Sequence, residues 1–537
     1  MGEGRLLFLQ MQTKFVKKLR LLNREVNMRK ISTLEYLAMP KFTRFWTKLW
    51  YSICSIPSAI GKFFKSIPSK IAVLFQKIGE WFVGVIDAFR YGNTATRLSA
   101  VIWGTGCFAY KQFGRGFLFL LYEIAFVLYM VFFGGHYISK LGTLGTVKME
   151  TNDYGVPIGD YDNSFQILLY SMLTIVVILF TIVMLFMSIK QAYDNQISYS
   201  VAKRCATVKD DMAQLMNKKF HLTILAFPSL TLVVFTVVPL MFMILVAFTN
   251  FNRNTMPPAN LFTWVGFSNF TTMLSGKGGT GAQMQDAAAY MRTFWYILRW
   301  TLVWAVLATV TNLFGGMIMA ILINKKGIKL KKLWRTCLVT VIAVPQFISL
   351  LLVSKMFQTT GGIVNYLLKL INLEPVKWLD GSRTMAQFTV IMVNMWVGIP
   401  HTVLTCTGIL MNIPGDLYEA AKIDGANPGQ MFFKITFPYM MFVLGPSLIT
   451  TFVGNINNFN MIFLLTGGKS GVSAQAGLVS SAGDLDLLIT WLYKMTVDKS
   501  DYDMASVIGI LLFIVIAFFS LIAYSRVGAV KNEEDFQ

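Results

Sequence analysis

The sequence predicts an all-α protein that crosses a membrane several times, and its composition and its block structure both predict this. Of the 537 residues, 55% are hydrophobic and only 14% are charged, and the mean hydropathy is +0.56. This is too much apolar surface for a soluble chain of this length. The apolar residues form blocks of about 20 residues, the length that a helix needs to span a bilayer. Because lipid offers backbone polar groups no partners, such blocks are expected to be helices.

Eight blocks have spanning length and are predicted to be transmembrane helices. They are Gly116 to Tyr137, Gln166 to Ile189, Leu222 to Phe248, Phe294 to Ile323, Thr336 to Met356, Ala386 to Met411, Met440 to Leu465 and Ala505 to Tyr524. The segment from Leu98 to Tyr110 is apolar but short and interrupted by glycine, so we expect it to be re-entrant or interfacial. The expected organisation is an arm (1–115), two spans (116–221), six spans (222–527) and a tail (528–537).

The distribution of charge predicts which side each connection faces. Lys and Arg exceed Asp and Glu by 48 to 27. The excess lies in the N-terminal arm, in the connection 190–221 and in the run 325–335, whereas the segment 139–165 is rich in acids. By the positive-inside rule the basic connections face the cytoplasm. We therefore expect both termini to be cytoplasmic, as an even number of spans requires.

The arm of residues 1–115 interleaves apolar and aromatic residues with lysine and arginine. This pattern is typical of amphipathic helices that lie on an anionic membrane leaflet. A nucleic-acid partner is the alternative that charge alone leaves open, but the neighbouring spans favour membrane lipid. The beginning of the chain lacks a short apolar core with a small-residue cleavage site, so we expect no cleavable signal peptide.

One polar interruption between two apolar blocks, residues 418–438, carries detailed helix punctuation. Asp416 is expected to cap a first short helix, and Gly425 to supply the left-handed residue that ends it. The Asn-Pro pair at Asn427 is expected to begin a second helix that Pro438 closes. Neither helix is long enough to cross a bilayer. The stretch therefore predicts a helix-turn-helix on the cytoplasmic face, and its nearly balanced charge suits a surface buried against a partner.

The residue types that usually hold metals or nucleotides form no such site in the sequence. The cysteines lack a CxxC pair and are interpreted as packing residues: Cys54, Cys107, Cys205, Cys337 and Cys406. His136, His221 and His401 are too far apart in sequence to suggest a metal site. Gly467 to Ser470 resembles the end of a P-loop, but Phe463 occupies the position of its first glycine. We therefore expect no catalytic residue, metal or bound cofactor here, and any ATPase must be another subunit.

Polar residues interrupt the later spans where a solute would pass. Asn455 and Asn458 are three positions apart and are expected to share a helix face, with Thr451 one turn earlier. Amides in lipid must pair or face a water-filled cavity, and such a face suits an uncharged polar ligand such as a sugar. His401 follows a Gly/Pro break that frees backbone carbonyls, and Gln346 follows a proline. The alternative is that these residues only join helices by hydrogen bonds.

The stretch 414–438 resembles the EAA loop of binding-protein-dependent ABC transporter permeases, where a short coupling helix sits in a groove of the ATP-hydrolysing subunit. The matching residues are Glu419, Ala420, Ala421, Asp424, Gly425, Ile435 and Pro438, with Phe437 where leucine is usual. From Leu222 to Val527 the chain is similar to the larger permease of maltose and maltodextrin importers, the MalF family. Further matches lie in 265–270, 457–459, 464–468 and 482–488. The resemblance implies the six-helix, MetI-like core of an ABC type I importer, preceded by two extra spans.

The resemblance also implies a sugar site midway across the membrane. The matching positions are Gln346, Val397, Gly398, His401, Thr451, Gly454, Asn455 and Asn458. His401 stands where the maltose permease has tyrosine, and Gly454 where it has an aromatic ring. Aromatic faces stack on sugar rings, so we expect a larger or differently shaped saccharide, with Asn455 and Asn458 retaining the hydroxyl-binding role. The short outer connection 249–293 and the long basic arm resemble Gram-positive relatives.

The function that the resemblance implies is ATP-driven import of maltodextrin or a related oligosaccharide across a bacterial plasma membrane. The implied partners are a second, MalG-like permease, two ATPase subunits of the MalK or MsmX type that use ATP and Mg, and an extracellular sugar-binding lipoprotein. One alternative is an ion-coupled secondary transporter, which would need intramembrane acids; Glu123 is expected to have a packing or interfacial role instead. The others are a polysaccharide-modifying enzyme, which would need a carboxylate pair, and a scaffold whose Asn455 face is closed by packing.

Overall fold

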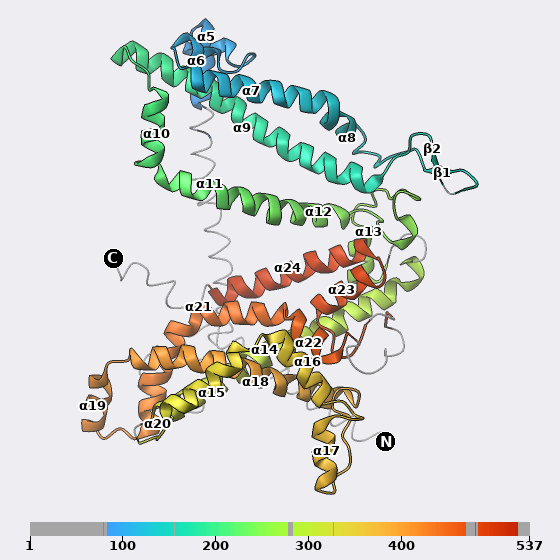
Figure 1. Cartoon of the computed structure of the whole chain (residues 1–537), viewed down its shortest axis with the longest axis vertical. Coiled ribbons are helices and arrows are strands. Elements are labelled where there is room, and N and C mark those ends of the chain that lie inside the picture. The colour runs from blue at the N-terminus through green and yellow to red at the C-terminus, as the bar shows by residue number, and fades with distance from the viewer. Residues whose placement is uncertain are drawn as a thin grey trace, which may run out of the picture. The chain divides into compact units, whose positions relative to one another are not determined.

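The computed structural model describes Gly79 and residues 83–154, 156–277, 283–325, 327–468, 478–479 and 482–524. The chain divides into two compact units, residues 1–73 and 74–537, and all described residues belong to the second. The amphipathic helices predicted for most of the arm, Cys54 and the tail 528–537 therefore lie outside the described residues. In the described part, helices make up almost all regular structure, which confirms the predicted all-α class (Figure 1).

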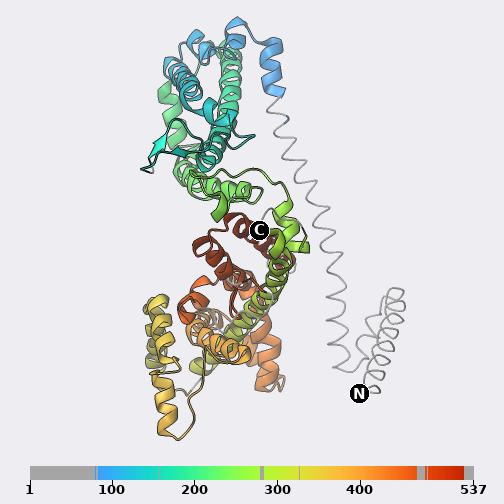
Figure 2. The same cartoon turned by 90° about the vertical axis from the view of Figure 1, so that its right-hand side faces the viewer.

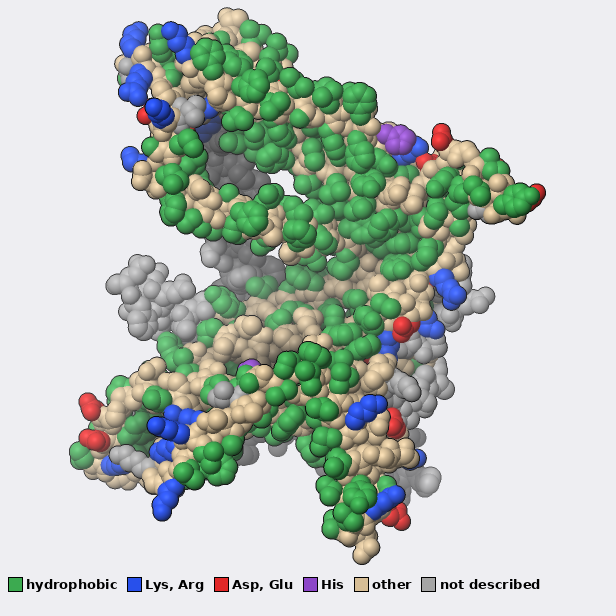
Figure 3. Space-filling view, in the orientation of Figure 1, with side chains coloured by type: hydrophobic (Ala, Val, Ile, Leu, Met, Phe, Trp, Pro, Cys, Tyr) green, Lys and Arg blue, Asp and Glu red, His purple; other side chains and the backbone are tan. Residues whose placement is uncertain are grey.

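The first group of helices contains the two extra spans and the first span of the expected six. Its elements are α5 (Thr94–Leu98), α6 (Thr105–Ala109), α7 (Phe113–Tyr129), the π-helical turn η1 (Met130–Gly134), α8 (Gly135–Ser139), α9 (Ser164–Ala202), α10 (Val208–Met216), α11 (Phe220–Leu232), the π-helical turn η2 (Val233–Val237) and α12 (Val238–Val246). Hydrophobic side chains gather over α7, α9 and α11 in Figure 3, as lipid contact requires. The segment 98–110, expected to be re-entrant or interfacial, forms a turn and the five-residue α6, too short to span.

Polar side chains of α7 bond to the turn before α6 and to α9. The carboxylate of Glu123 on α7 accepts a hydrogen bond from the Trp103 backbone N–H at 2.9 Å. The hydroxyls of Tyr122 on α7 and Thr181 on α9 lie 2.8 Å apart. A polar group within an apolar span is stable when it has such a partner. Glu123 thus takes the packing role that we expected.

One carboxylate holds the connection between α8 and α9 together by hydrogen bonds. The strands β1 (Glu150–Thr151) and β2 (Pro157–Ile158) pair antiparallel in this connection. Asp162, 5% exposed, accepts hydrogen bonds from Lys140 Nζ at 2.7 Å and from the backbone N–H groups of Thr146 and Val147 at 2.8 and 3.0 Å. Burial raises the pKa of Asp162, but these bonds outweigh it and lower the pKa from 3.8 to about 2.

Asp162→Asn is expected to destabilise the folded conformation of this connection by about 2 kcal/mol at neutral pH. Because the pKa of Asp162 is lower in the folded than in the unfolded state, the ionised carboxylate stabilises the folded conformation. The stabilisation is complete above the unfolded pKa of 3.8 and is lost as the pH falls through about 2. Limited proteolysis of residues 140–163 should therefore be faster in the variant at pH 7, and the difference should shrink toward pH 2. Asp160→Asn, an exposed acid in the same connection, is the control. Equal cleavage of wild type and Asp162→Asn at pH 7 would contradict the assigned role.

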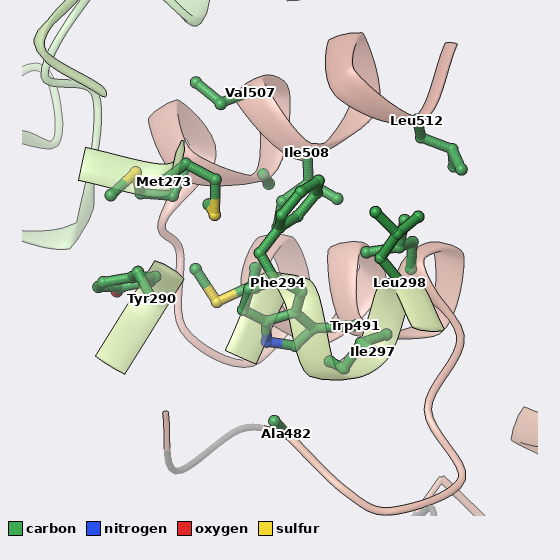
Figure 4. Packing of buried hydrophobic residues seen from close by; sticks show 14 of the residues in the cluster. Met273, Tyr290, Phe294, Ile297, Leu298, Ala482, Trp491, Val507, Ile508 and Leu512 are labelled. Carbon is green, nitrogen blue, oxygen red and sulfur yellow. The ribbon is translucent and has the colours of Figure 1, made fainter. Parts of the chain in front are cut away.

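The second group of helices forms the core around α14. Its elements are the 3₁₀ turn η3 (Arg253–Thr255), α13 (Ser268–Ser275), α14 (Gln283–Asn324), α15 (Lys331–Ala343), α16 (Gln346–Met356), α17 (Ile363–Leu370), α18 (Arg383–Met411), α19 (Gly415–Ile423), α20 (Pro428–Met431), the π-helical turn η4 (Phe432–Thr436), α21 (Phe437–Ile456), α22 (Phe459–Thr466), α23 (Leu488–Val497) and α24 (Tyr502–Tyr524). Phe294 of α14, Trp491 of α23 and Ile508 of α24 are buried together (Figure 4). Because lipid is itself apolar, such contacts stabilise the bundle by close packing.

A buried ion pair fixes the beginning of α23. Lys494 Nζ lies 3.0 Å from Asp486 Oδ2, and the two side chains are 9% and 0% exposed. Asp486 also accepts hydrogen bonds from the Gly483 backbone N–H at 2.7 Å and the Thr490 hydroxyl at 2.9 Å. Removing charges from water is costly unless they are paired and hydrogen-bonded. This network therefore holds the connection that precedes α23 in one conformation.

In the described residues the structure has seven or eight candidate spans against the eight predicted, and two blocks predicted as single helices, 336–356 and 440–465, each consist of two helices. Seven described helices are each long and apolar enough to cross a membrane, and the bent pair of α15 and α16 makes an eighth span when the two are taken together. These two helices meet at an angle of 93°. Val344 adopts an extended conformation between them, and Pro345 follows it. Proline disfavours helical geometry in the preceding residue and cannot donate a helix hydrogen bond. The block predicted as one helix is therefore broken at Pro345.

A small subdomain around α17 projects between α16 and α18 (Figure 1; gold in Figure 2). The buried side chain of Asn365 organises it. Its Nδ2 lies 3.4, 3.1 and 2.9 Å from the carbonyls of Gln358, Thr359 and Val376. Its Oδ1 accepts hydrogen bonds from the Val376 backbone N–H and Trp378 Nε1, each at 3.0 Å. The side-chain amide of Asn365 thus joins the segments that precede and follow α17.

Candidate functional site

A cavity of about 390 Å³ forms where α14, the α15–α16 break, α18 and the end of α21 meet. This size lies toward the lower end of the range of roughly 300–1,000 Å³ that is usual for small-molecule sites. The fourteen lining residues are Asn312, Val341, Ile342, Ala343, Val344, Pro345, Gln346, Ser349, Asn394, Val397, Gly398, His401, Asn455 and Asn458. The break at Pro345 places irregular backbone on the cavity wall, where it need not face lipid.

Most of the predicted site residues meet at this cavity. The six that line it are Gln346, Val397, Gly398, His401, Asn455 and Asn458. Thr451 and Gly454 do not line it; both are exposed on α21, and the Thr451 hydroxyl bonds to the Ser447 carbonyl of its own helix at 2.9 Å. The structure therefore separates the eight predicted residues into six on the cavity and two on an open face of α21.

Asn455 and Asn458 reach the cavity differently from our expectation. The expected shared helix face is wrong, because α21 ends at Ile456 and Asn458 is the N-cap of α22. The Asn458 side chain accepts a hydrogen bond from the Met461 backbone N–H at 3.3 Å. Asparagine side chains compete with the helix for backbone hydrogen bonds and favour such caps. Asn455 and Asn458 thus approach the cavity from two separate elements.

Both the side chain and the backbone carbonyl of Asn455 are hydrogen-bonded to α14. Its side-chain Nδ2 donates to the Thr309 hydroxyl on α14 at 3.0 Å, and its backbone carbonyl accepts from Trp304 Nε1 at 3.0 Å. This is the helix-joining role that the alternative interpretation predicted. The same contacts fix the side chain at the cavity wall, so joining helices and lining the cavity are compatible.

Two buried asparagines that the sequence analysis did not select also line the cavity. Asn312 on α14 and Asn394 on α18 are 7% and 4% exposed. Asn312 Oδ1 and Asn394 Nδ2 are buried without a hydrogen-bond partner in the described chain. Each residue interrupts an apolar block, which is the signal that pointed to Asn455. Ser349 was missed as well, because one serine in a span is unremarkable in sequence.

The lining of the cavity restricts its chemistry. None of the fourteen lining residues is Lys, Arg, Asp or Glu, and none carries a Phe, Tyr or Trp ring. Five carry a side-chain amide, Asn312, Gln346, Asn394, Asn455 and Asn458. Amides donate and accept hydrogen bonds without charge. Elsewhere in the described residues no cluster of three metal-binding side chains occurs. Such a lining can hydrogen-bond a neutral polar ligand.

The second candidate site is the turn between α19 and α20. Gly425 has the expected left-handed conformation, with φ of +75°. Asn427 caps α20 as expected, in a capping box with Gln430. Two expectations are wrong. Asp416 lies in the first turn of α19, whose N-cap is Pro414. Pro438 does not close the second helix.

The chain continues helically past Pro438 because a π-helical turn precedes it. In η4 the Phe437 backbone N–H donates to the Phe432 carbonyl, five residues earlier, and Pro438 then occupies the first turn of α21. Proline is tolerated there because its missing N–H is not required. The turn 424–427 is thus joined to Asn455 by one continuous helical segment.

The turn presents its predicted coupling residues to the surface. Glu419, Ala420, Asp424 and Gly425 are exposed, and Ala421 is half-buried. Exposed apolar side chains accompany them: Leu417, Ile423 and Phe433 are 47%, 87% and 69% exposed. Apolar residues at this exposure next to a charged rim mark a contact surface.

Comparison with known proteins assigns the chain to a family. The family model for binding-protein-dependent transport system inner membrane components matches residues 312–529. The galactooligosaccharides transport system permease protein GanP of Bacillus subtilis is 30% identical over 438 residues, which are 81% of this chain and 98% of that protein. The chain belongs to this family of inner membrane components. The permease resembles the maltodextrin transport system permease protein MalC of Streptococcus pneumoniae at 31% identity, over 81% of its own length and 96% of MalC.

A third relative is the maltose/maltodextrin transport system permease protein MalF of Klebsiella aerogenes. It is 34% identical to the permease over 262 residues, which are 48% of each chain. The resemblance to the MalF family drawn from the EAA loop and the later spans is therefore confirmed. The permease is a multi-pass protein of the plasma membrane.

Proposed function

We propose that this permease is one of two transmembrane subunits of an ATP-driven, binding-protein-dependent importer of a neutral oligosaccharide. The observation that carries the proposal is the cavity of about 390 Å³, lined by five amides and no Lys, Arg, Asp or Glu. Sugar hydroxyls need donors and acceptors, and a buried charge without a counter-ion would be costly there. The relatives named for maltodextrin and galactooligosaccharides support the same substrate class.

The site is proposed to be completed by a second permease. Thr451 and Gly454 lie on an exposed face of α21, and outside the adjoining turns of α21 no described atom lies within 4 Å of the position that a Cβ on Gly454 would take. An open face with a hydroxyl beside the cavity is what half of a translocation pathway would present. The partner would cover this face, and the sugar would contact Thr451 and Gly454 only in the assembled pair.

The exposed turn between α19 and α20 is proposed to couple the pathway to ATP hydrolysis. Glu419 would anchor it in a groove of the ATPase, with Ala420, Ala421 and Asp424 in contact and Gly425 forming the turn. Two ATPase subunits would use ATP and Mg, and an extracellular lipoprotein would deliver the sugar. The basic run 325–335 and the α19–α20 turn would face the cytoplasm, as would both termini.

The first test is purification of the tagged permease from native membranes, followed by reconstitution with the proteins that are retained. Recovery of a second permease and an ATPase, with uptake of maltotriose or a galactotriose that requires ATP, is expected. Asn455→Ala should reduce that uptake about tenfold, the worth of one to two hydrogen bonds, without loss of assembly. Uptake that persists without ATP but collapses with the ion gradient would instead establish a secondary transporter.

A further inference from the structure

Two cavities adjoin where α7, α9 and α10 meet, and they share no lining residue with the candidate sugar site. Their volumes are about 350 Å³ and about 650 Å³. Arg115 on α7 and Asp211 on α10 line both of them. The Arg115 guanidinium donates from Nε and Nη2 to the two carboxylate oxygens of Asp211. This ion pair therefore lies where the two cavities meet.

The smaller cavity is lined mainly by apolar side chains. They are Leu118 and Phe119 on α7, Met184 and Met187 on α9, and Leu215 on α10. Arg115 lies in the first turn of α7, and Leu118 follows one turn further into the apolar span. Figure 3 shows the surface hollowed between α9 and α11, beside α10. A groove that extends from a charged group at the end of a span into its apolar part matches a phospholipid, whose ionic head lies at the membrane surface and whose chains lie in the hydrocarbon core.

The larger cavity is basic. Its charged lining residues are the cations Lys111, Arg115, Lys203 and Arg204 and the acid Asp211. Arg204 pairs with Asp210 at 3.2 Å. In the described chain Lys111 and Lys203 form no ion pair, and Lys203 Nζ lies 5.9 Å from the centroid of the Tyr199 ring. Asp211 accepts from two of the five N–H groups of the Arg115 guanidinium, which leaves three for another acceptor. An anionic group would therefore meet available cationic donors here.

Two buried amides hold the walls of the larger cavity in place. Gln112 and Asn195 are 6% and 4% exposed. Gln112 Nε2 donates to the Ala206 carbonyl, and Gln112 Oε1 accepts from Asn195 Nδ2, both at 2.7 Å. These bonds join the beginning of α7 to α9 and to the segment before α10. The first turn of α7, which has no side-chain cap, also lines this cavity and favours an anion.

The position of the basic cavity along the chain agrees with an anionic ligand from the membrane. The connection 190–221, which contains α10, is one of the basic segments that the positive-inside rule places on the cytoplasmic side. Lysine and arginine side chains gather near the junction of α9 and α10 (Figure 3). The cytoplasmic leaflet carries a negative surface potential from its anionic lipids, which attracts such side chains.

We propose that the two cavities together bind one anionic phospholipid. Its phosphate lies against Lys111, Arg115 and Lys203 in the larger cavity, and one acyl chain occupies the smaller cavity. Four cations against one acid favour an anionic over a zwitterionic lipid. Because α9 packs against α12 and α10 bridges α9 and α11 (Figure 1), the lipid joins the two extra spans to the first span of the core. This site is separate from the candidate sugar site, so the proposal does not depend on the proposed function.

The test is native mass spectrometry of the purified full-length permease, with any subunits that it retains. The protein is delipidated and then given equal amounts of dioleoyl phosphatidylglycerol and dioleoyl phosphatidylcholine. One phosphatidylglycerol per permease should be retained, with a preference of about tenfold over phosphatidylcholine. Lys111→Gln/Lys203→Gln should lower the affinity for phosphatidylglycerol roughly thirtyfold, because each basic side chain near an anionic lipid contributes about fivefold. Lys209→Gln/Lys218→Gln is the matched control, since it removes two exposed lysines of the same connection that line neither cavity; it should bind as the wild type does.

Leu215→Trp tests the apolar half of the site independently of charge. The larger side chain should occupy the smaller cavity and lower the affinity for phosphatidylglycerol about tenfold, the worth of about two buried methylene groups. Met216→Trp introduces the same side chain at a neighbouring position of α10 that is 66% exposed and lines neither cavity. This control should bind normally. Glycerol phosphate, which has a head group without acyl chains, should not displace the lipid at the same concentration.

Equal retention of the two lipids, or retention of neither, would overturn the proposal. Equal losses in the two lysine pairs would also overturn it, because they would show attraction to surface charge in general. Displacement by glycerol phosphate, or unchanged affinity in Leu215→Trp, would show that no acyl chain occupies the smaller cavity and would reject a lipid site.

Discussion

Gly425→Val is expected to abolish sugar uptake driven by ATP hydrolysis while leaving membrane insertion intact. Gly425 has φ of +75°, where a residue with a Cβ is strained by roughly 1–2 kcal/mol, and a β-branched side chain suffers most. Among the described residues, apart from its two neighbours in the chain, no atom lies within 4 Å of the position that a Cβ on Gly425 would take. Within this chain, glycine therefore supplies conformation and not space. Uptake and ATPase activity of the reconstituted importer measure the effect.

Gly425→Asn tests whether the turn requires the left-handed backbone conformation or the absence of a side chain. Asparagine tolerates the left-handed conformation, so this variant should retain most of the uptake. If this variant loses uptake as completely as Gly425→Val, the turn requires the absence of a side chain, because the proposed ATPase groove leaves no room for one. Normal uptake by Gly425→Val would remove the coupling role from this turn.

Asn365→Ala is expected to unfold the α17 subdomain locally, at a cost on the order of 3 kcal/mol or more. The substitution leaves the Val376 backbone N–H and Trp378 Nε1 without an acceptor, and removes the donor to the carbonyls of Thr359 and Val376. Unpaired buried polar groups carry their full desolvation cost. Hydrogen exchange should therefore rise in residues 358–378 and stay unchanged in α14.

Asn372→Gly provides the control for the α17 subdomain. Asn372 is exposed and has φ of +57°, a conformation that glycine adopts freely. This variant should keep the exchange pattern of the wild type. Unchanged exchange in Asn365→Ala would show that the hydrogen bonds of Asn365 are not what holds the subdomain together.

The spans were predictable because the thickness of the bilayer sets their length, whereas the behaviour of individual prolines was not. Pro345 breaks a helix and Pro438 does not. Val344 is extended before the first, whereas Phe437 is helical before the second, after the π-helical turn η4. Sequence shows the proline in each case. It does not show whether neighbouring helices favour a bent or a continuous path, because that depends on packing.

For the candidate site, the sequence predicted some of the amide residues but not how they are arranged. Asn455 and Asn458 were found because polar residues in apolar blocks need a partner or a cavity. The same reasoning applies to Asn312 and Asn394, and a consistent use of it would have included them. Their meeting at one cavity depends on the crossing of α14 and α18, which arises only from tertiary packing.

The helical segment that continues without a break through Pro438 connects the proposed ATPase contact to the cavity. From Pro428 to Ile456 the chain is helical and, at 1.5 Å per residue, about 40 Å long. One end begins at the proposed ATPase contact, and the other carries Asn455 into the cavity. Because this segment is helical throughout, a displacement of the turn would be transmitted along it to the cavity. Because Asn455 is hydrogen-bonded to Trp304 and Thr309 of α14, α14 would move with it, and the shape of the cavity that both helices line would change with the position of the turn.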